Sequence, residues 1–186
     1  IADFAKNGGD YVSYGAYAKG AGTNNVFEQN MIFCEWRHQG GKRIGLSLGG
    51  GGTGARYCAD GNCLNEQASS LVRNNIIGNC PMEVGLYLNQ SQNSQIYNNL
   101  IFRSRGIDLA GEQTTASLYN NIIDGRIIAK RGAHYKSINN VNPVLNAVFN
   151  RPKSKELFMD ADNGNYKMQT LELIEQTNSA MPTNAL

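Results

Sequence analysis

Apolar residues in this chain recur in short pairs around polar residues rather than with a helical period. The segment "IYNNLIF" (96–102) places two asparagines between large apolar residues, and the arrangement returns in "LVRNNIIG", "LYNNIID" and "SINNVN" and, with one asparagine, in "VFEQNMIF". Asparagine is depleted in strands, so its return at these positions indicates a structural repeat. Helical spacing of apolar residues is visible only near the C-terminus, in "LELIEQT" (171–177).

The repeat has a period of roughly 20 to 24 residues. The last asparagine of each pair moves from Asn75 to Asn99, Asn121 and Asn140, in steps of 24, 22 and 19, and Asn30 precedes Asn75 by 45, which is two such steps. A second series of segments keeps pace with the first: "YGAYAK", "IGLSLG", "VGLYLN", "RGIDLA" and "GRIIAK". This period, with two or three short strands per unit, is typical of a solenoid. Leucine-rich repeats share the period, but the chain shows neither their leucine lattice nor their helical segment.

The pattern predicts an all-β fold, a right-handed parallel β-helix. Successive turns of such a coil stack at about 4.8 Å, so that equivalent residues form columns. A buried asparagine at the corner between two strands tolerates the left-handed backbone conformation that the corner requires, and its amide can bond both the next asparagine and the backbone. We therefore expect the repeated asparagines to be structural.

The chain is predicted to be one domain, residues 1–186. We expect helical turns over 1–142, an inserted loop at 50–68, and C-terminal turns with an irregular cap over 143–186. The first residues, "IADF", look like the middle of a turn, so we expect turns upstream of them and an N-terminal truncation.

Alternation of side chains along the second series of strands predicts which residues face outward. Leu46, Leu48 and their equivalents (Ala16, Ala18, Leu86, Leu88, Ile107 and Leu109) are expected inside. Two outer columns are expected, one of Tyr17, Ser47, Tyr87, Asp108 and Ile128, the other of Lys19, Gly49, Asn89, Ala110 and Lys130.

Charge and composition narrow the class of partner. Seventeen basic and fifteen acidic residues give a net charge of +2, which is too balanced for a nucleic-acid-binding surface, and no apolar run is long enough for a membrane span. Tyrosines, amides and charges on one face suit a polyhydroxylated chain. The predicted partner is a polysaccharide or glycan, bound by Tyr17, Tyr87, Asn89, Asp108 and Lys130. Ordinary solvated surface is the alternative for each residue, and the sequence does not indicate the oligomeric state.

The turn pattern resembles the pectate-lyase-like parallel β-helices over nearly the whole chain. The segment "YGAYAKGAGTNNVFEQNMIF", with the later "IGLSLGGGG", is similar to the lysine-bearing turn of chondroitinase B-like and alginate-lyase-like polysaccharide lyases. The resemblance implies that Lys19 removes the proton beside a uronate carboxylate, assisted by an arginine one turn later. Gly49 occupies that arginine's position, which leaves Arg43 and Arg105 as candidates for the assisting role.

The same resemblance implies calcium held by acidic residues just upstream of the lysine. Val12 and Tyr14 stand there instead, so no calcium ligands are found and no cofactor is predicted. The expected function is therefore cleavage of uronate-containing glycans by β-elimination or, alternatively, non-catalytic glycan binding or a structural role. Whether the chain is an enzyme stays open.

The stretch "LGGGGTGARYCADGNC" is predicted to be the inserted loop. It lacks the Lys-Ser/Thr ending of a phosphate-binding loop. The five-residue step from Cys58 to Cys63, around the turn "ADGN", predicts a local disulfide. Cys34 and Cys80 are expected to stack in adjacent turns, either paired or merely buried. No metal site is predicted, because both histidines are remote from this loop in sequence. Four cysteines favour an oxidising compartment, so the predicted location is periplasmic or secreted.

Overall fold

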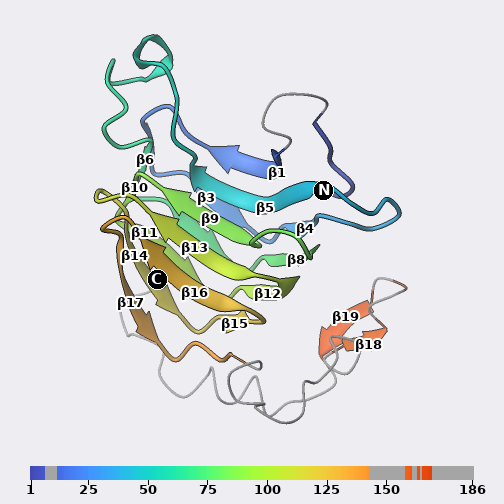
Figure 1. The fold of residues 1–186 in the computed structure, drawn as a ribbon. Coiled ribbons are helices and arrows are strands. Elements are labelled where there is room, and N and C mark those ends of the chain that lie inside the picture. Colours follow the sequence, from blue (N-terminus) through green and yellow to red (C-terminus); the bar gives the residue numbers. More distant parts are fainter. Residues whose placement is uncertain (7–11, 143–157, 161–162, 164, 169–186) are drawn as a thin grey trace.

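The predicted parallel β-helix is confirmed in the computed structural model, which describes residues 1–6, 12–142, 158–160, 163 and 165–168. The chain coils so that successive turns add strands to the same parallel sheets, and the turns stack along one axis (Figure 1).

Four parallel sheets make up the coil within the described residues. The first sheet contains β1 (Val12–Ala18), β5 (Lys42–Gly49), β9 (Leu86–Asn89), β13 (Gly106–Ala110) and β16 (Arg126–Lys130). The short second sheet contains β2 (Gly22–Thr23), β6 (Gln67–Ala68) and β10 (Ser91–Gln92). The third contains β3 (Val26–Glu28), β7 (Leu71–Arg73), β11 (Ser94–Tyr97), β14 (Thr115–Tyr119) and β17 (His134–Ile138). The fourth contains β4 (Met31–Phe33), β8 (Ile76–Cys80), β12 (Leu100–Ser104) and β15 (Ile122–Ile123).

The core consists of stacked apolar columns inside the coil. Leu46 and Leu48 of β5 pair in register with Leu86 and Leu88 of β9, and all four are fully buried. The other residues that were predicted to face inward also belong to this core. Ile107 and Leu109 are fully buried, and Ala16 and Ala18 pack against the same core. The fourth sheet faces them with the column Ile32, Ile77, Ile101 and Ile123.

A glycine column allows these two sheets to approach closely. A Cβ atom on Gly45 would lie 2.4 Å from Cγ2 of Ile77, and one on Gly85 would lie 2.7 Å from Cγ2 of Ile101. Gly15, one turn earlier, faces Ile32 in the same way, at 2.7 Å. The glycine that opens these strand motifs therefore makes room for the isoleucine column.

The repeated asparagines form a continuous ladder. In each step the backbone N–H and the side-chain Nδ2 of one asparagine both donate to Oδ1 of the next, from Asn30 through Asn75, Asn99 and Asn121 to Asn140. Each amide from Asn75 onward also donates to a backbone carbonyl, for example Asn99 Nδ2 to the oxygen of Val72 at 2.8 Å. The predicted structural role of these residues matches this geometry.

The left-handed corner, however, does not belong to the ladder asparagine. The residue before it takes the positive φ angle: Asn74, Asn98, Asn120 and Asn139 have φ between 52° and 56°, and Gln29 has 56°. The prediction that one asparagine serves both purposes is therefore wrong. The two members of each pair have different roles. The first adopts the αL conformation and turns the chain, and the second donates and accepts the hydrogen bonds of the ladder.

The inserted segment lies between β5 and β6, and it projects from one end of the coil (Figure 1). It spans 50–66 rather than 50–68, because Gln67 and Ala68 form β6 and pair with strands on both sides. The Cys34–Cys80 disulfide joins the two turns on either side of the insertion, across a sequence separation of 46 residues. It thereby fixes the neighbouring turns that the insertion separates in sequence.

The two ends of the chain are described only in part. Ala2 forms a parallel bridge with Phe33, so the first residues extend the fourth sheet beyond β4. In the C-terminal region β18 (Phe158–Asp160) and β19 (Asn165–Met168) form an antiparallel pair. The rest of the cap predicted over 143–186, and the helical segment at 171–177, lie outside the described residues.

Candidate functional site

The predicted first outer column exists on the first sheet. Register pairs place Tyr17 beside Ser47, Ser47 beside Tyr87, Tyr87 beside Asp108, and Asp108 beside Ile128. Tyr17 is 60% exposed, whereas Ser47 between the two tyrosines is fully buried and donates its hydroxyl to the carbonyl oxygen of Gly49. The column therefore presents aromatic side chains to solvent on both sides of a covered serine.

The second column is in register but is mostly closed to solvent. Gly49, Asn89, Ala110 and Lys130 pair in order, yet only 9% of Asn89 and 1% of Ala110 are exposed. The start of the inserted loop covers Asn89, since a Cβ atom on Gly51 would lie 2.8 Å from its Nδ2. Asn89 keeps its place in the outer column but is closed to solvent, because a loop that folds back over the strand is invisible to the alternation of its residues.

Two of the predicted binding residues neutralise each other. The Lys130 ammonium forms an ion pair with the Asp108 carboxylate, one strand away. The Asp108 side chain is 16% exposed and that of Lys130 is 48% exposed. Any anionic ligand of Lys130 must therefore compete with Asp108, which weakens the case for these two residues as a glycan contact.

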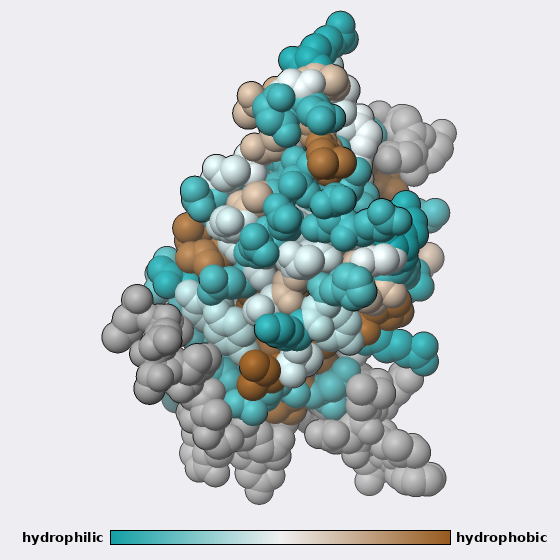
Figure 2. Space-filling model, turned by 90° about the vertical axis from the view of Figure 1, so that its left-hand side faces the viewer, coloured by the Kyte–Doolittle hydropathy of each residue, from teal (hydrophilic) through white to brown (hydrophobic). Residues whose placement is uncertain are grey.

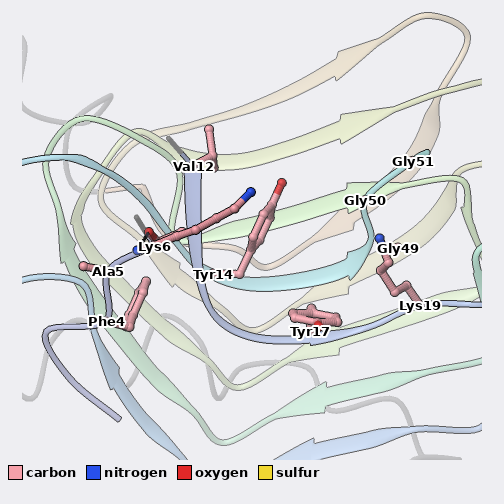
Figure 3. A pocket seen from close by; sticks show the side chains of 11 residues that line it. Phe4, Ala5, Lys6, Val12, Tyr14, Tyr17, Lys19, Gly49, Gly50 and Gly51 are labelled. Carbon is pink, nitrogen blue, oxygen red and sulfur yellow. Dashed lines mark hydrogen bonds between the residues drawn. The ribbon is translucent and has the colours of Figure 1, made fainter. Parts of the chain in front are cut away.

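A cleft of about 440 Å³ opens beside Tyr17 (Figure 3). Tyr17 and Lys19 lie along its floor, the glycines of the inserted loop form one side, and the N-terminal segment forms the other. Its lining includes Phe4, Lys6, Tyr14, Tyr17, Lys19, Gly49, Gly50 and Gly51.

Sequence reasoning missed Lys6 and Tyr14. Strict alternation puts Tyr14 on the inward side with Ala16, but the strand bends between Tyr14 and Tyr17 (Figure 3), and their rings meet edge to face with centroids 6.2 Å apart. The glycine at position 15 was the available signal, because it interrupts the strand where the bend occurs. Lys6 gave no signal, since only the tertiary structure brings the N-terminal segment to this face.

The three cationic residues predicted for catalysis do not come together. Arg43 pairs in register with Ser13, six residues before Lys19, which corresponds to roughly 20 Å of strand. Its guanidinium is buried and donates to the carbonyl oxygens of Cys34 and His38. Arg105 lies three strands from β1 and at the same end of the sheet as Arg43. The register therefore separates both arginines from Lys19.

Buried polar groups hold the inserted loop in place. Glu66 is 1% exposed, and its two carboxylate oxygens accept hydrogen bonds from the backbone N–H and the hydroxyl of Thr53, both at 3.0 Å. Farther along, the N–H of Ala59 donates to the carbonyl oxygen of Gly20, next to Lys19. The loop is thus anchored at its base and against the strand end that carries Lys19.

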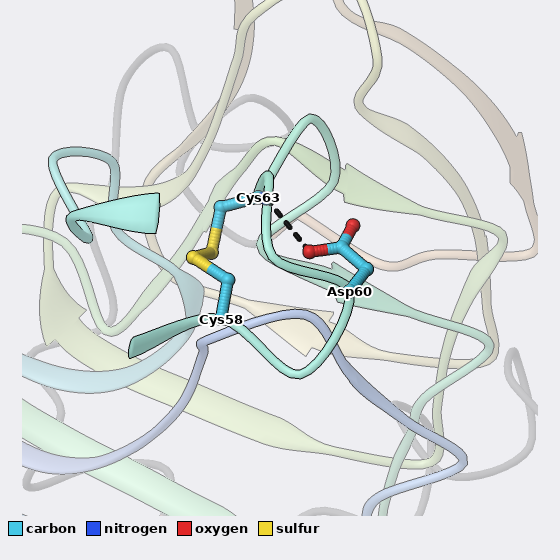
Figure 4. A group of neighbouring side chains, drawn as sticks. All are labelled: Cys58, Asp60 and Cys63. Carbon is cyan, nitrogen blue, oxygen red and sulfur yellow. Dashed lines mark hydrogen bonds between the residues drawn. A yellow bond between two sulfur atoms is a disulfide. The ribbon is translucent and has the colours of Figure 1, made fainter. Parts of the chain in front are cut away.

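The predicted Cys58–Cys63 disulfide is present in the inserted loop, and a carboxylate lies beside it (Figure 4). Asp60 accepts hydrogen bonds from the backbone N–H groups of Cys63 and Asn62, and these bonds lower its pKa. The sulfur atoms and a carboxylate oxygen lie within 4.8 Å of one another, which makes this the one group of three potential metal ligands among the described residues. A disulfide, however, offers no thiolate.

The remaining surface gives no second cluster of this kind within the described residues. The side of the molecule that carries the inserted loop is mainly hydrophilic, with only isolated hydrophobic side chains (Figure 2). Within the same residues, no helix has the length and apolarity that a membrane span requires.

Comparison with known proteins gives a match to a family model. A model of the NosD family, described as periplasmic copper-binding protein, matches residues 53–170, which is more than half of the chain. No curated protein and no solved structure matches the chain. The matched residues do not include the segment that resembles the chondroitinase-like and alginate-lyase-like site. The predicted location, periplasmic or secreted, is confirmed, because the family is periplasmic and the two disulfides fit an oxidising compartment. With its stacked parallel turns and this match, the chain belongs to the NosD family of periplasmic β-helix proteins.

Proposed function

We propose that this chain is a non-catalytic glycan-binding β-helix, with its site in the cleft beside Tyr17. The observation that carries the proposal is the aromatic floor of that cleft, where Tyr17 is 60% exposed and stands in one column with Tyr87. Tyrosine rings stack on the apolar faces of sugars while their hydroxyls stay in contact with water. Lys19, near Tyr17 on the floor of the cleft, can bind an anionic substituent.

The arrangement suits a chain rather than a single sugar. Tyr17 and Tyr87 are separated by one intervening strand, which corresponds to about 10 Å across the sheet. Ser47 between them is covered, so the two rings are separate platforms on one face. A linear glycan lying across the strands can contact both platforms, and its affinity then comes from several weak contacts.

Cleavage by β-elimination is the less supported version of the same function. A lysine base requires a cation that neutralises the uronate carboxylate, because only then does the neighbouring proton become acidic. Neither Arg43 nor Arg105 approaches Lys19, and Arg43 donates to backbone carbonyls instead. Lys6 lines the same cleft and is the cation that a lyase version of the site would use.

One experiment separates binding from cleavage. The protein is incubated with a panel of uronate-containing and neutral polysaccharides, while absorbance of the unsaturated product and binding by calorimetry are followed. The proposal expects binding without product, and Tyr17→Ala is expected to weaken binding by about 1 kcal/mol. Product that disappears in Lys19→Ala would establish the lyase instead. No binding to any glycan, by a folded protein, would leave the face as ordinary surface.

Copper binding is a second candidate, favoured by the ligand group at Cys58, Asp60 and Cys63. Thiolate sulfurs are the ligands that copper(I) prefers. In the disulfide form these residues do not fit the metal, because both sulfurs are bonded to each other and Asp60 already accepts two backbone hydrogen bonds. This candidate therefore concerns only the reduced loop.

Copper stoichiometry of the oxidised and the dithiothreitol-reduced protein tests this candidate. Copper(I) is offered in competition with a colorimetric chelator, and the Cys58→Ser/Cys63→Ser double variant serves as the control. We expect one copper bound by the reduced protein, and none by the oxidised protein or the variant. Equal binding by the variant would place the copper elsewhere in the chain.

A further inference from the structure

Within the described residues, the last turn of the coil carries an excess of positive charge. Residues 125–142 contain no aspartate or glutamate, and their lysines and arginines are Arg126, Lys130, Arg131 and Lys136. All four residues are exposed. Lys130 is paired with an aspartate of the neighbouring strand, whereas the other three form no ion pair within the described part of the chain. This end of the coil therefore attracts an anionic partner.

The strand β17 belongs to the same turn, and one of its two sides is unpaired. It pairs with β14, and no strand among the described residues pairs with its other side. All of its residues, from His134 to Ile138, are exposed. An edge strand with this exposure can accept a further strand, because its backbone groups on that side are accessible.

Alternate residues of β17 point their backbone groups to the unpaired side. The N–H of His134 donates to the carbonyl oxygen of Thr114 at 3.0 Å, so the backbone groups of His134 face β14. Successive residues of a strand point these groups to opposite sides, so those of Tyr135 and Ser137 point away from β14. Neither residue has a backbone hydrogen bond on that side within the described part of the chain. Each therefore offers one donor and one acceptor to an added strand.

The side chains of β17 indicate what an added strand would carry. Tyr135 is in register with Ala116, whose side chain is buried in the core, so Tyr135 lies on the inner side of the sheet and is 38% exposed. Its neighbours His134 and Lys136 point outward. Side chains that face one another on adjacent strands interact directly. An added strand is therefore favoured by acidic residues opposite His134 and Lys136 and by an apolar residue opposite Tyr135.

The same side chains disfavour a second copy of this chain as the occupant. Two copies that pair through β17 would bring the cationic Lys136 of each close to the other, and like charges on facing strands are destabilising. A copy stacked head to tail would present β3, the opposite edge of the third sheet. The register of that sheet would then place Val26 beside Lys136, where an acidic residue is needed.

We propose that the unpaired side of β17 binds an extended acidic segment of a partner protein, as an additional strand of the third sheet. Tyr135 and Ser137 supply the main-chain hydrogen bonds that give affinity, and His134 and Lys136 select acidic side chains. The proposal is independent of glycan binding beside Tyr17, because β1, which carries Tyr17, lies at the opposite end of the first sheet from the last turn.

A fluorescein-labelled octapeptide of alternating glutamate and valine, with blocked ends, is the probe. Anisotropy titrations with the full chain are expected to show saturable binding that weakens as salt is raised. Amide hydrogen exchange, followed by NMR, is expected to slow at least about tenfold at Tyr135 and Ser137 when the peptide binds. The same peptide N-methylated at each glutamate keeps its charge but loses those N–H donors, so it is expected to bind at least about tenfold more weakly.

Two variants separate the backbone contribution from the charge. Tyr135→Pro removes one N–H on the unpaired side, where proline leaves the bonds to β14 in place, and it is expected to weaken peptide binding about tenfold. Tyr135→Thr, which keeps the N–H, is its control. Lys136→Glu is expected to weaken binding at least about tenfold, because it places like charges opposite one another. Lys42→Glu, at an exposed position of β5, makes the same charge change and is expected to have little effect.

The proposal fails if the peptide does not bind, or if Lys136→Glu and Lys42→Glu weaken its binding equally. Equal affinity for the N-methylated peptide would also overturn it, because the attraction would then be one of charge alone. Amides of Tyr135 and Ser137 that are protected before any peptide is added would show that the chain itself or a second copy already covers this edge. Loss of glycan binding in Tyr17→Ala would leave the proposal unaffected.

Discussion

Oδ1 of Asn99 accepts two hydrogen bonds from Asn75, one from its backbone N–H at 3.0 Å and one from its side-chain Nδ2 at 2.9 Å. The two residues are 24 positions apart in the chain and belong to neighbouring turns. Each ladder asparagine therefore completes the hydrogen bonding of the previous turn, and the identity of this residue fixes the register of the coil.

Asn99→Ala is expected to lower the free energy of unfolding by about 1 to 3 kcal/mol, because it strands the buried donors of Asn75 and removes the bond to the oxygen of Val72. Asn98→Gly is the matched control, because glycine adopts the positive φ of that position without strain. Urea unfolding of the two variants measures the difference. Equal stability of both would contradict the ladder's role.

Gly45→Ala tests the glycine column. A methyl group there would lie 2.4 Å from Cγ2 of Ile77 and 2.6 Å from the carbonyl oxygen of Gly85, so we expect a loss of about 1 to 3 kcal/mol from overpacking. Gly50→Ala is the control, because nothing lies within 4 Å of its added methyl group. Thermal melts of the pair check the prediction, and an unaltered Gly45→Ala melt would refute it.

The two disulfides are expected to differ in their contribution to stability. The Cys34–Cys80 bond closes a loop with a sequence separation of 46, and the Cys58–Cys63 bond one of 5. Chain entropy then assigns about 4 kcal/mol to the first and about 2 kcal/mol to the second. Double serine variants, unfolded in urea, measure both losses. A larger loss in the Cys58→Ser/Cys63→Ser variant would reverse this order.

Acid should release the loop that carries Trp36. Removal of water raises the pKa of Asp3, but hydrogen bonds from the backbone N–H groups of Arg37, Trp36 and His38 outweigh this effect and hold the pKa at about 2, below the usual 3.8. Because the folded-state pKa is depressed, the stabilisation is present above about pH 4 and is lost as the pH falls through about 2.

Tryptophan fluorescence between pH 5 and 1.5 follows this release, since Trp36 is the single tryptophan. We expect the wild-type emission to change mainly between about pH 4 and 2. Asp3→Asn is the control variant and should show no transition in that window, because the residue no longer titrates. A transition of the same size in Asp3→Asn would assign it to other carboxylates.

The amino-acid sequence by itself determined the coil. Equivalent residues of a solenoid stack directly on one another, so the spacing from Asn75 to Asn99 and Asn121 predicts which residues pair between turns. Alternation within "GLSLG" and "GLYLN" predicts which side chains are buried in the core. The short step from Cys58 to Cys63 is likewise a local property, and their disulfide could be predicted for that reason.

Only the tertiary structure decided what the outer face offers to a ligand. The bend at Gly15 turned Tyr14 toward Tyr17, the inserted loop covered Asn89, and the register held Arg43 away from Lys19. These outcomes depend on contacts between segments that have no fixed spacing in the chain. A repeat specifies the parts that stack, whereas the loops that leave it and the side chains they cover follow from packing in three dimensions.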